Sequence, residues 1–300
     1  MIWSNFVWRI IIFSVAGLGI GGNFFLFAKH VYASVMGLKK KPMDFIIIQL
    51  TLSNAITLWA SGILDIRLPF HFNDYSGSVV CKIVVYLGRV ARGLSICTSC
   101  LFSMVQAITI SPRTVLWGKL KPQSPWQVLT SLLLFWIINF LISSNLLHYV
   151  TSVSSMNRSA VGMYLRHCYM IRSKQIIRWL FLSLMALRDV IFQSLMGWSS
   201  GHMAFCLYEH RKRVLYLHSS RLAKNSSPEI RATIRILILM ICFLFFYWAD
   251  FIFSFYIGSV LAPDSMILNI KVFLGLGYAS LSPFVLISRD VSKVKYCHSH

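Results

Sequence analysis

The sequence is poor in charged residues and above all in acidic ones. Charged residues make up 13% of its 300 positions, and only 9 residues are Asp or Glu, whereas an average soluble chain has about 25% charged residues. Its 7 cysteines are too few and too scattered for a disulfide-rich scaffold. Internal repeats, low-complexity tracts and long linkers are also absent. A cytosolic enzyme, a disordered tail and a disulfide-rich miniprotein are therefore excluded.

Sequence motifs for catalysis are absent as well. There is no nucleophile–base pair, no phosphate-binding glycine loop and no HExxH motif. Cys97 and Cys100 have the spacing of half a redox or metal site, but no second pair is near and core packing is the better interpretation. His298 and His300 offer only two ligands on a terminus, which makes a weak metal site. We therefore expect no catalytic residue, no cofactor and no metal.

Long apolar runs dominate what is present. Hydrophobic residues make up 57% of the chain and the mean hydropathy is +0.67. A membrane-spanning helix needs about 20 mainly apolar residues, and the chain offers seven such runs. They cover residues 10–28, 45–64, 83–110, 126–147, 179–207, 236–261 and 266–288. The sequence therefore predicts an all-α membrane protein, with residues 1–300 forming a single bundle of seven transmembrane helices.

The basic residues predict how the bundle is oriented. Lys and Arg number 29 and give a formal net charge of +20. In a soluble chain this would indicate nucleic-acid binding, but here they lie mainly between apolar runs, where they meet anionic lipid headgroups. With the N-terminus outside, the inner loops and the tail carry more Lys and Arg than the outer segments. The positive-inside rule then predicts an external N-terminus and a cytoplasmic C-terminus.

Two further features agree with this orientation. Asn157 begins a glycosylation sequon in the loop after the fourth span, which would then be lumenal, whereas the sequon at Asn225 would lie in the cytosol and stay unused. Cys81 begins the third span and Cys168 lies in the same outer loop as Asn157, so both face the oxidising side. We predict a glycan on Asn157 and a disulfide between Cys81 and Cys168.

Six segments in and between the spans carry distinctive strings of residues. These strings are Gln49-Leu50-Thr51-Leu52-Ser53-Asn54-Ala55, Arg89-Val90-Ala91-Arg92-Gly93, Gln106-Ala107-Ile108-Thr109-Ile110-Ser111-Pro112-Arg113, His210-Arg211-Lys212-Arg213-Val214, Ser226-Ser227-Pro228-Glu229-Ile230-Arg231-Ala232-Thr233 and Ser282-Pro283-Phe284-Val285-Leu286. They closely resemble the vomeronasal type 1 receptors, which are G-protein-coupled pheromone receptors. The third span ends without Asp-Arg-Tyr and the seventh has Ser-Pro in place of Asn-Pro, as is typical of that family.

The resemblance implies a function. It implies a receptor in the plasma membrane of chemosensory (vomeronasal) neurons, with a small-molecule ligand bound in the outer half of the bundle. It also implies a heterotrimeric G protein of the inhibitory class as the partner. One departure is Gly88, which stands where many members of the family have His. We expect this glycine to leave a gap in the outer half of the bundle.

The ionisable residues singled out inside the predicted spans are Arg89, Arg92, Arg188, Asp189 and Asp250. Because charges at membrane depth are costly, they are expected to face the bundle interior, where they pair or line a wet cavity. One interpretation is structural: Arg89 and Arg92 pair with one Asp each and hold three helices together.

The other interpretation is functional. Three Arg against two Asp leave one cation to bind an anionic group of an otherwise apolar ligand, and we expect that cation to be Arg92. Aromatic residues that could wall the same pocket are Tyr86, Trp179, Tyr247, Trp248 and Phe251. The full set proposed for ligand binding is Tyr86, Arg89, Arg92, Arg188, Asp189 and Asp250.

The inner ends of the third, fifth and sixth spans are basic. The residues expected to contact a G protein are Ser111, Pro112, Arg113, Arg211, Lys212, Arg213 and Arg231. Their charge alone is also explained by the positive-inside rule, so only the resemblance favours the receptor role. Two rival functions are a bitter-taste-type receptor, against which the Arg89–Gly93 string argues, and a small transporter or channel, for which the expected inverted repeats are missing.

Overall fold

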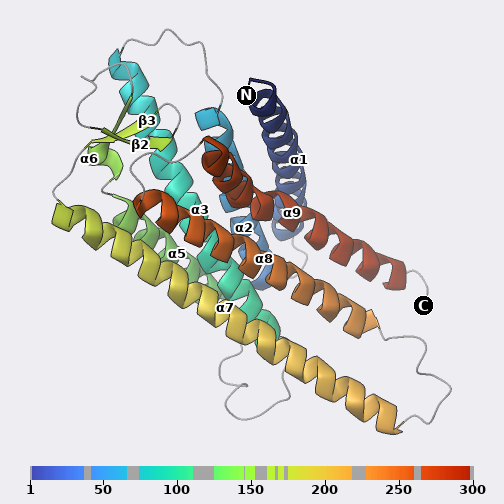
Figure 1. Cartoon of the computed structure of the whole chain (residues 1–300). Coiled ribbons are helices and arrows are strands. Elements are labelled where there is room, and N and C mark those ends of the chain that lie inside the picture. Colours follow the sequence, from blue (N-terminus) through green and yellow to red (C-terminus); the bar gives the residue numbers. More distant parts are fainter. Residues whose placement is uncertain are drawn as a thin grey trace.

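The computed structural model describes residues 2–36, 42–65, 74–110, 125–144, 146–152, 161–165, 168–171, 175–217, 228–259 and 265–297. Its long helices are α1 (Ile2–Val35), α2 (Pro42–Asp65), α3 (Asp74–Ile110), α5 (Pro125–Ser143), α7 (Gln175–Leu217), α8 (Pro228–Ser259) and α9 (Ser265–Cys297). A short helix, α6 (Leu146–Tyr149), and the strands β1 (Val150–Ser152), β2 (Val161–Leu165) and β3 (Cys168–Ile171) follow α5. Figure 1 shows the long helices side by side as a bundle.

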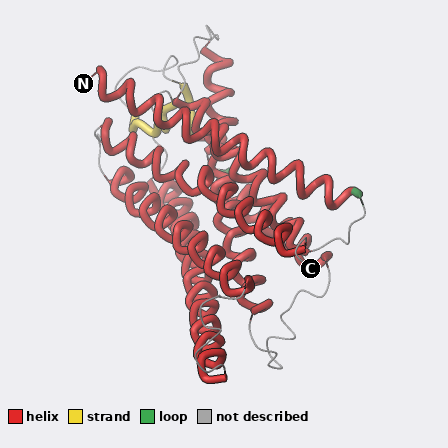
Figure 2. Tube along the Cα trace, turned by 90° about the vertical axis from the view of Figure 1, so that its right-hand side faces the viewer, coloured by secondary structure: helices red, strands yellow, loops and turns green. Residues whose placement is uncertain are grey.

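The seven-helix bundle predicted from the sequence is confirmed. Seven helices are long and apolar enough to cross a membrane, over Ile10–Val35, Pro42–Gly62, Val79–Ile110, Trp126–Ser143, Trp179–Glu209, Leu237–Ser254 and Asn269–Ile287. The chain is therefore built as a multi-pass membrane protein. The start of α1 and the three strands lie at one end of the bundle, and the end of α9 lies at the other (Figures 1 and 2).

One helix end differs from the prediction. The fourth span was expected to reach residue 147, but α5 ends at Ser143. The backbone N–H of Ser144 donates to the carbonyl of Leu141 at 3.3 Å, and the Ser144 hydroxyl donates to the same carbonyl at 2.9 Å. This hydroxyl competes with the next helical hydrogen bond and ends the helix there. The sixth span was expected to reach residue 261, and its last two positions lie outside the described residues.

The small sheet was not predicted from the sequence. Its strand order is β1-β3-β2 with both pairs antiparallel. Cys168 begins β3 and pairs with Ser152 on one side and Leu165 on the other. In the same structure Cys81 near the start of α3 is disulfide-bonded, while Cys97, Cys100, Cys206 and Cys242 are free. The choice of Cys168 as its partner stays a prediction.

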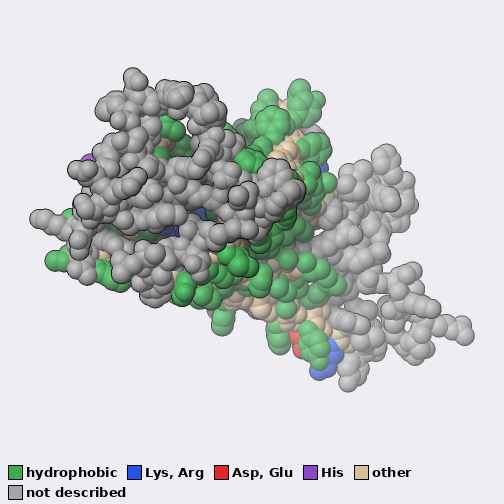
Figure 3. Space-filling view, turned by 45° about the horizontal axis from the view of Figure 1, so that its top comes forward, with side chains coloured by type: hydrophobic (Ala, Val, Ile, Leu, Met, Phe, Trp, Pro, Cys, Tyr) green, Lys and Arg blue, Asp and Glu red, His purple; other side chains and the backbone are tan. Residues whose placement is uncertain are grey.

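The helix α3 runs through the centre of the bundle. Of its spanning window, 67% is buried, which is the largest share among the seven helices. Its core includes the fully buried Leu94, Ile96 and Phe102. The outer faces of the other helices carry large apolar side chains such as Trp198 and Phe24, and Figure 3 shows hydrophobic side chains spread over the described helices. Lipid chains rather than water suit such a surface.

Candidate functional site

Three of the ionisable residues predicted inside the spans meet between α3, α7 and α8. Arg92 Nη2 lies 2.5 Å from Asp250 Oδ2 and 3.8 Å from Asp189 Oδ2. Both aspartates are buried. Arg92 therefore joins its own helix to α8 at close range and to α7 at longer range. The expectation that each aspartate receives a different α3 arginine was wrong, because Arg92 serves both.

Arg188 is held by a second set of contacts. Its Nε and Nη2 donate to Asp189 Oδ1 at 2.9 Å and 2.7 Å, and its Nη1 donates to Asn139 Oδ1 at 2.6 Å. A Cβ placed on Gly93 would overlap both Asn139 Oδ1 and the Arg188 guanidinium. Only a glycine on α3 leaves room for this contact between α5 and α7. Sequence reasoning did not find this role of Gly93 or Asn139.

Two further basic residues, Arg89 and Lys271, lie near the same carboxylates. Arg89 Nη1 contacts Met185 Sδ on α7 at 3.2 Å. Lys271 on α9 is within electrostatic reach of Asp250, Arg89 and Arg92. Lys271 was not among the residues expected at the site, yet it lies inside the spanning part of α9. A basic residue within the predicted span 266–288 was the signal that could have revealed it.

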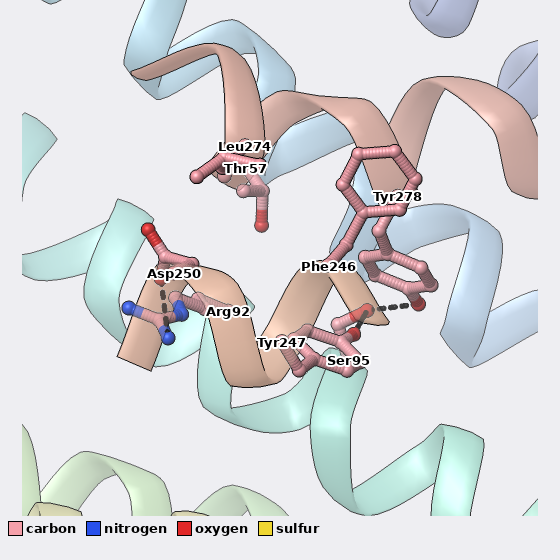
Figure 4. A pocket seen from close by; sticks show the side chains of 9 residues that line it. Thr57, Arg92, Ser95, Phe246, Tyr247, Asp250, Leu274 and Tyr278 are labelled. Atoms are coloured by element: carbon pink, nitrogen blue, oxygen red, sulfur yellow. Dashed lines mark hydrogen bonds and ion pairs between the residues drawn. The ribbon is translucent and has the colours of Figure 1, made fainter. Parts of the chain in front are cut away.

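A small pocket opens beside the Arg92–Asp250 ion pair. Its lining comes from α2, α3, α8 and α9 and consists of Thr57, Arg92, Ser95, Phe246, Tyr247, Asp250, Leu274, Gly275 and Tyr278. Figure 4 shows the ion pair on one side of it and a group of hydroxyls on the other. As it stands the pocket has room for about one water molecule.

The hydroxyls tie the pocket to the interior of the bundle. Tyr247 donates to Ser95 Oγ at 3.0 Å, and Ser95 also shares a hydrogen bond with Tyr278. Ser95 donates onward to Asn54 Oδ1 at 2.6 Å, and Asn54 Nδ2 donates to Ser282 Oγ at 2.9 Å. Buried hydrogen bonds between helices are the polar contacts that hold membrane bundles together. These hydrogen bonds connect the pocket to α2, α3, α8 and α9.

Several residues expected at the pocket lie elsewhere. Tyr86 stacks on Phe140, and its hydroxyl donates to the Phe140 carbonyl at 3.4 Å. Trp179 is 58% exposed and Trp248 is 38% exposed, so both face outward. Of the aromatic residues named from the sequence, Tyr247 alone is found in the pocket lining.

The gap expected at Gly88 is not there. A Cβ on this residue would lie 3.0 Å from the Ala60 side chain on α2, which is closer than ordinary van der Waals contact. The glycine lets α2 and α3 approach each other instead of leaving a cavity. The expectation was wrong because a missing side chain can be filled by a neighbouring helix.

Other predicted residues cannot be placed in a site. Asn157, Ser111, Pro112 and Arg113 lie outside the described residues. Arg211, Lys212 and Arg213 fall near the end of α7 and Arg231 near the start of α8, where the structure defines the backbone. Lys212 is exposed. Within the described part of the chain no cluster of three metal-ligating side chains is found.

Comparisons with known proteins give a consistent result. The model of a family described as the vomeronasal organ pheromone receptor family matches residues 6–299. The chain is 32% identical to human vomeronasal type-1 receptor 4 over 98% of both chains. It is 31% identical to vomeronasal type-1 receptor 100 of Rattus norvegicus, over 96% of this chain and 87% of that one. It is 30% identical to vomeronasal type-1 receptor 46 of Mus musculus, over 96% and 92%.

Proposed function

Because this chain belongs to the vomeronasal type 1 receptor family, we propose that it is a pheromone receptor that binds a small-molecule chemosignal and activates a heterotrimeric G protein. The pocket beside Arg92 and Asp250 is the observation that carries the proposal. It combines apolar walls with a few convergent polar groups, which is the usual character of a small-molecule site. It also touches four of the spanning helices, so an occupant would act on their relative positions.

The pocket lies in the half of the bundle that is proposed to face outward. Arg92 is nearer to the start of the α3 span than to its end, and Asp250 is near the end of the α8 span. Both positions point to the end of the bundle that carries the three strands (Figure 1). With the N-terminus outside, this is the side on which a chemosignal arrives. Asp189 and Arg188 then lie behind the pocket lining, next to Arg92, with Arg89 near the same carboxylates, while Tyr86 lies against Phe140.

The small volume of the pocket constrains how a ligand could bind. Small-molecule sites have volumes of about 300–1,000 Å³, whereas this pocket has room for about one water molecule. Binding therefore requires the side chains or helices around it to move apart. A ligand shifts such an equilibrium only by its preference for one of the two states. The hydroxyl contacts of Ser95 with Tyr247 and Tyr278 are the bonds that this movement would stretch first.

The proposed cytoplasmic end of the bundle is the surface that would bind the G protein. The basic ends of α7 and α8, with Ser111, Pro112 and Arg113 after α3, would contact a G protein of the inhibitory class. Lys212 on α7 is exposed and available for such a contact. The same proposal places the protein in the plasma membrane of vomeronasal chemosensory neurons, with no nucleic acid or cofactor as partner.

The topology gives a first testable prediction. If the N-terminus faces outward, Asn157 is lumenal and carries a glycan, while Asn225 does not. Replacing Asn157 by Gln should increase the gel mobility of the expressed receptor, and glycosidase treatment of the variant should then cause no further shift. The matched control is Asn225→Gln, which should migrate like the wild type. A mobility shift in the Asn225 variant with none in the Asn157 variant would show that the topology is inverted.

A second prediction tests the function itself. Cells expressing the receptor with an inhibitory-class G-protein reporter should respond to members of a panel of steroid-like and volatile compounds. Replacing Leu274, which lines the pocket, by Trp should fill the pocket and raise the half-maximal concentration of those compounds at least tenfold. The matched control is Leu281→Trp on the same helix, since Leu281 is exposed and should tolerate the change.

Two results would contradict the receptor proposal. One is a wild-type chain that reaches the cell surface and gives no G-protein signal with any compound of the panel. The other is ion flux in proteoliposomes that contain the purified chain and no G protein, which would favour the transporter or channel alternative.

A further inference from the structure

One face of α9 lines the pocket and continues beyond it. Leu274, Gly275 and Tyr278 are all part of the lining. In an α-helix the residues three, four and seven positions apart share one face. Lys271 precedes these three by that spacing, so it lies on the same face, one turn nearer to the start of α9. A Cβ on Gly275 would lie 3.5 Å from Asp250 Oδ1, which shows how close this face comes to the buried carboxylate.

The two buried aspartates near this face are each paired with an arginine. Asp250 is engaged by Arg92 at 2.5 Å, and Asp189 by Arg188 at 2.7 Å. Lys271 is half-buried, and within the described part of the chain it forms neither a hydrogen bond nor an ion pair. It lies within electrostatic reach of Asp250, which attracts it but is already paired with Arg92, and of Arg89 and Arg92, which repel it. A cation held in such a position costs free energy unless something pairs with it.

The pairing of the two carboxylates explains why Lys271 stands apart. Arg92 and Arg188 each form an ion pair with an aspartate, whereas no carboxylate of the described residues forms one with Lys271. The sequence interpretation assigned the spare charge to an arginine of α3. The structure instead has Arg92 in contact with a carboxylate and places the lysine at the end of the pocket-lining face.

We infer that Lys271 is the residue that recognises an anionic group, a carboxylate or a sulfate, on the small molecule that this receptor binds. The apolar body of that molecule would contact Leu274 and Phe246, and its anionic oxygen would accept a charge-assisted hydrogen bond from Lys271 Nζ. The inference rests on the proposed function only in assuming that the pocket receives a small molecule.

The test measures binding without a G protein. Purified receptor in detergent is heated with a panel of steroid and fatty carboxylates and sulfates, each beside its uncharged methyl ester or parent alcohol, and its thermal midpoint is recorded. Wild-type receptor should be stabilised by at least one anion more than by its uncharged partner. In Lys271→Met the affinity for that anion should fall at least tenfold, while Lys271→Arg should keep it. The control Lys82→Met removes a half-buried lysine near the start of α3 and should bind like the wild type.

The same measurement without added compound gives an independent readout. Because Lys271 is partly buried without an ion pair of its own and is repelled by two arginines, Lys271→Met should have a midpoint equal to or above that of the wild type. A midpoint that falls in Lys271→Met would show that the lysine supports the fold and would overturn the inference. A panel in which no anion stabilises the wild type more than its uncharged partner, or in which Lys271→Met keeps the preference, would overturn it as well. Failure of G-protein signalling with intact anion binding would contradict the proposed function and leave the inference standing.

Discussion

Replacing Gly93 by Ala is expected to remove most of the receptor from the cell surface. The added methyl group would overlap Asn139 Oδ1 and the Arg188 guanidinium. Arg188 would have to move, and its bonds to Asn139 and Asp189 would be lost together. Breaking a buried ion pair so that a charge stays without its partner costs about 3–5 kcal/mol. This is a large fraction of the stability of a protein of ordinary size.

The controls use the same chemical change at sites where space is free. A Cβ on Gly201 of α7 or on Gly62 of α2 would meet nothing within 4 Å. Gly201→Ala and Gly62→Ala should therefore reach the surface as well as the wild type, as measured by antibody staining of intact cells. Equal surface levels of Gly93→Ala and these controls would show that Arg188 does not need the space beside Gly93.

The sequence predicted the helices well because each span needs a long apolar run. It also predicted that Arg92, Asp189 and Asp250 lie inside the bundle, since charges at membrane depth avoid lipid and pair with one another. It did not predict the pairing. Arg188 and Asp189 are consecutive and no pairing between them was predicted, yet the long Arg188 side chain reaches the carboxylate beside it. Side-chain reach and helix rotation are set by packing, which the sequence pattern does not specify.

Two other features, the short strands and the role of Lys271, could not be predicted from hydropathy. The strands after α6 are three to five residues long, and such short strands depend on pairing with each other rather than on their own periodicity. Lys271 lies within the predicted span 266–288, but it was not singled out as a buried cation. The residues around the pocket were thus found in part, and the cation on the pocket-lining face of α9 was missed.

Replacing Asp250 by Asn is expected to have the second-largest effect. Asp250 is buried and is the carboxylate closest to Arg92. Without it Arg92 keeps only Asp189, which is 3.8 Å away and already bonded to Arg188. Arg92 and Arg188 would then share one carboxylate, so we expect a loss of several kcal/mol of stability and a strong fall in surface expression. The control Asp44→Asn changes a half-buried aspartate at the start of α2 and should have a smaller effect.

A double-mutant cycle on Arg92 and Asp250 tests most directly whether these two residues hold each other inside the bundle. The four proteins are the wild type, Arg92→Gln, Asp250→Asn and the double variant, and the measurement is the thermal midpoint of each in detergent. Because the double variant leaves neither charge alone, it should be more stable than Asp250→Asn and should lose less than the sum of the two single losses. We expect a coupling of about 0.5–3 kcal/mol. Losses that add would contradict the pairing, and with it the ion pair that borders the proposed ligand pocket.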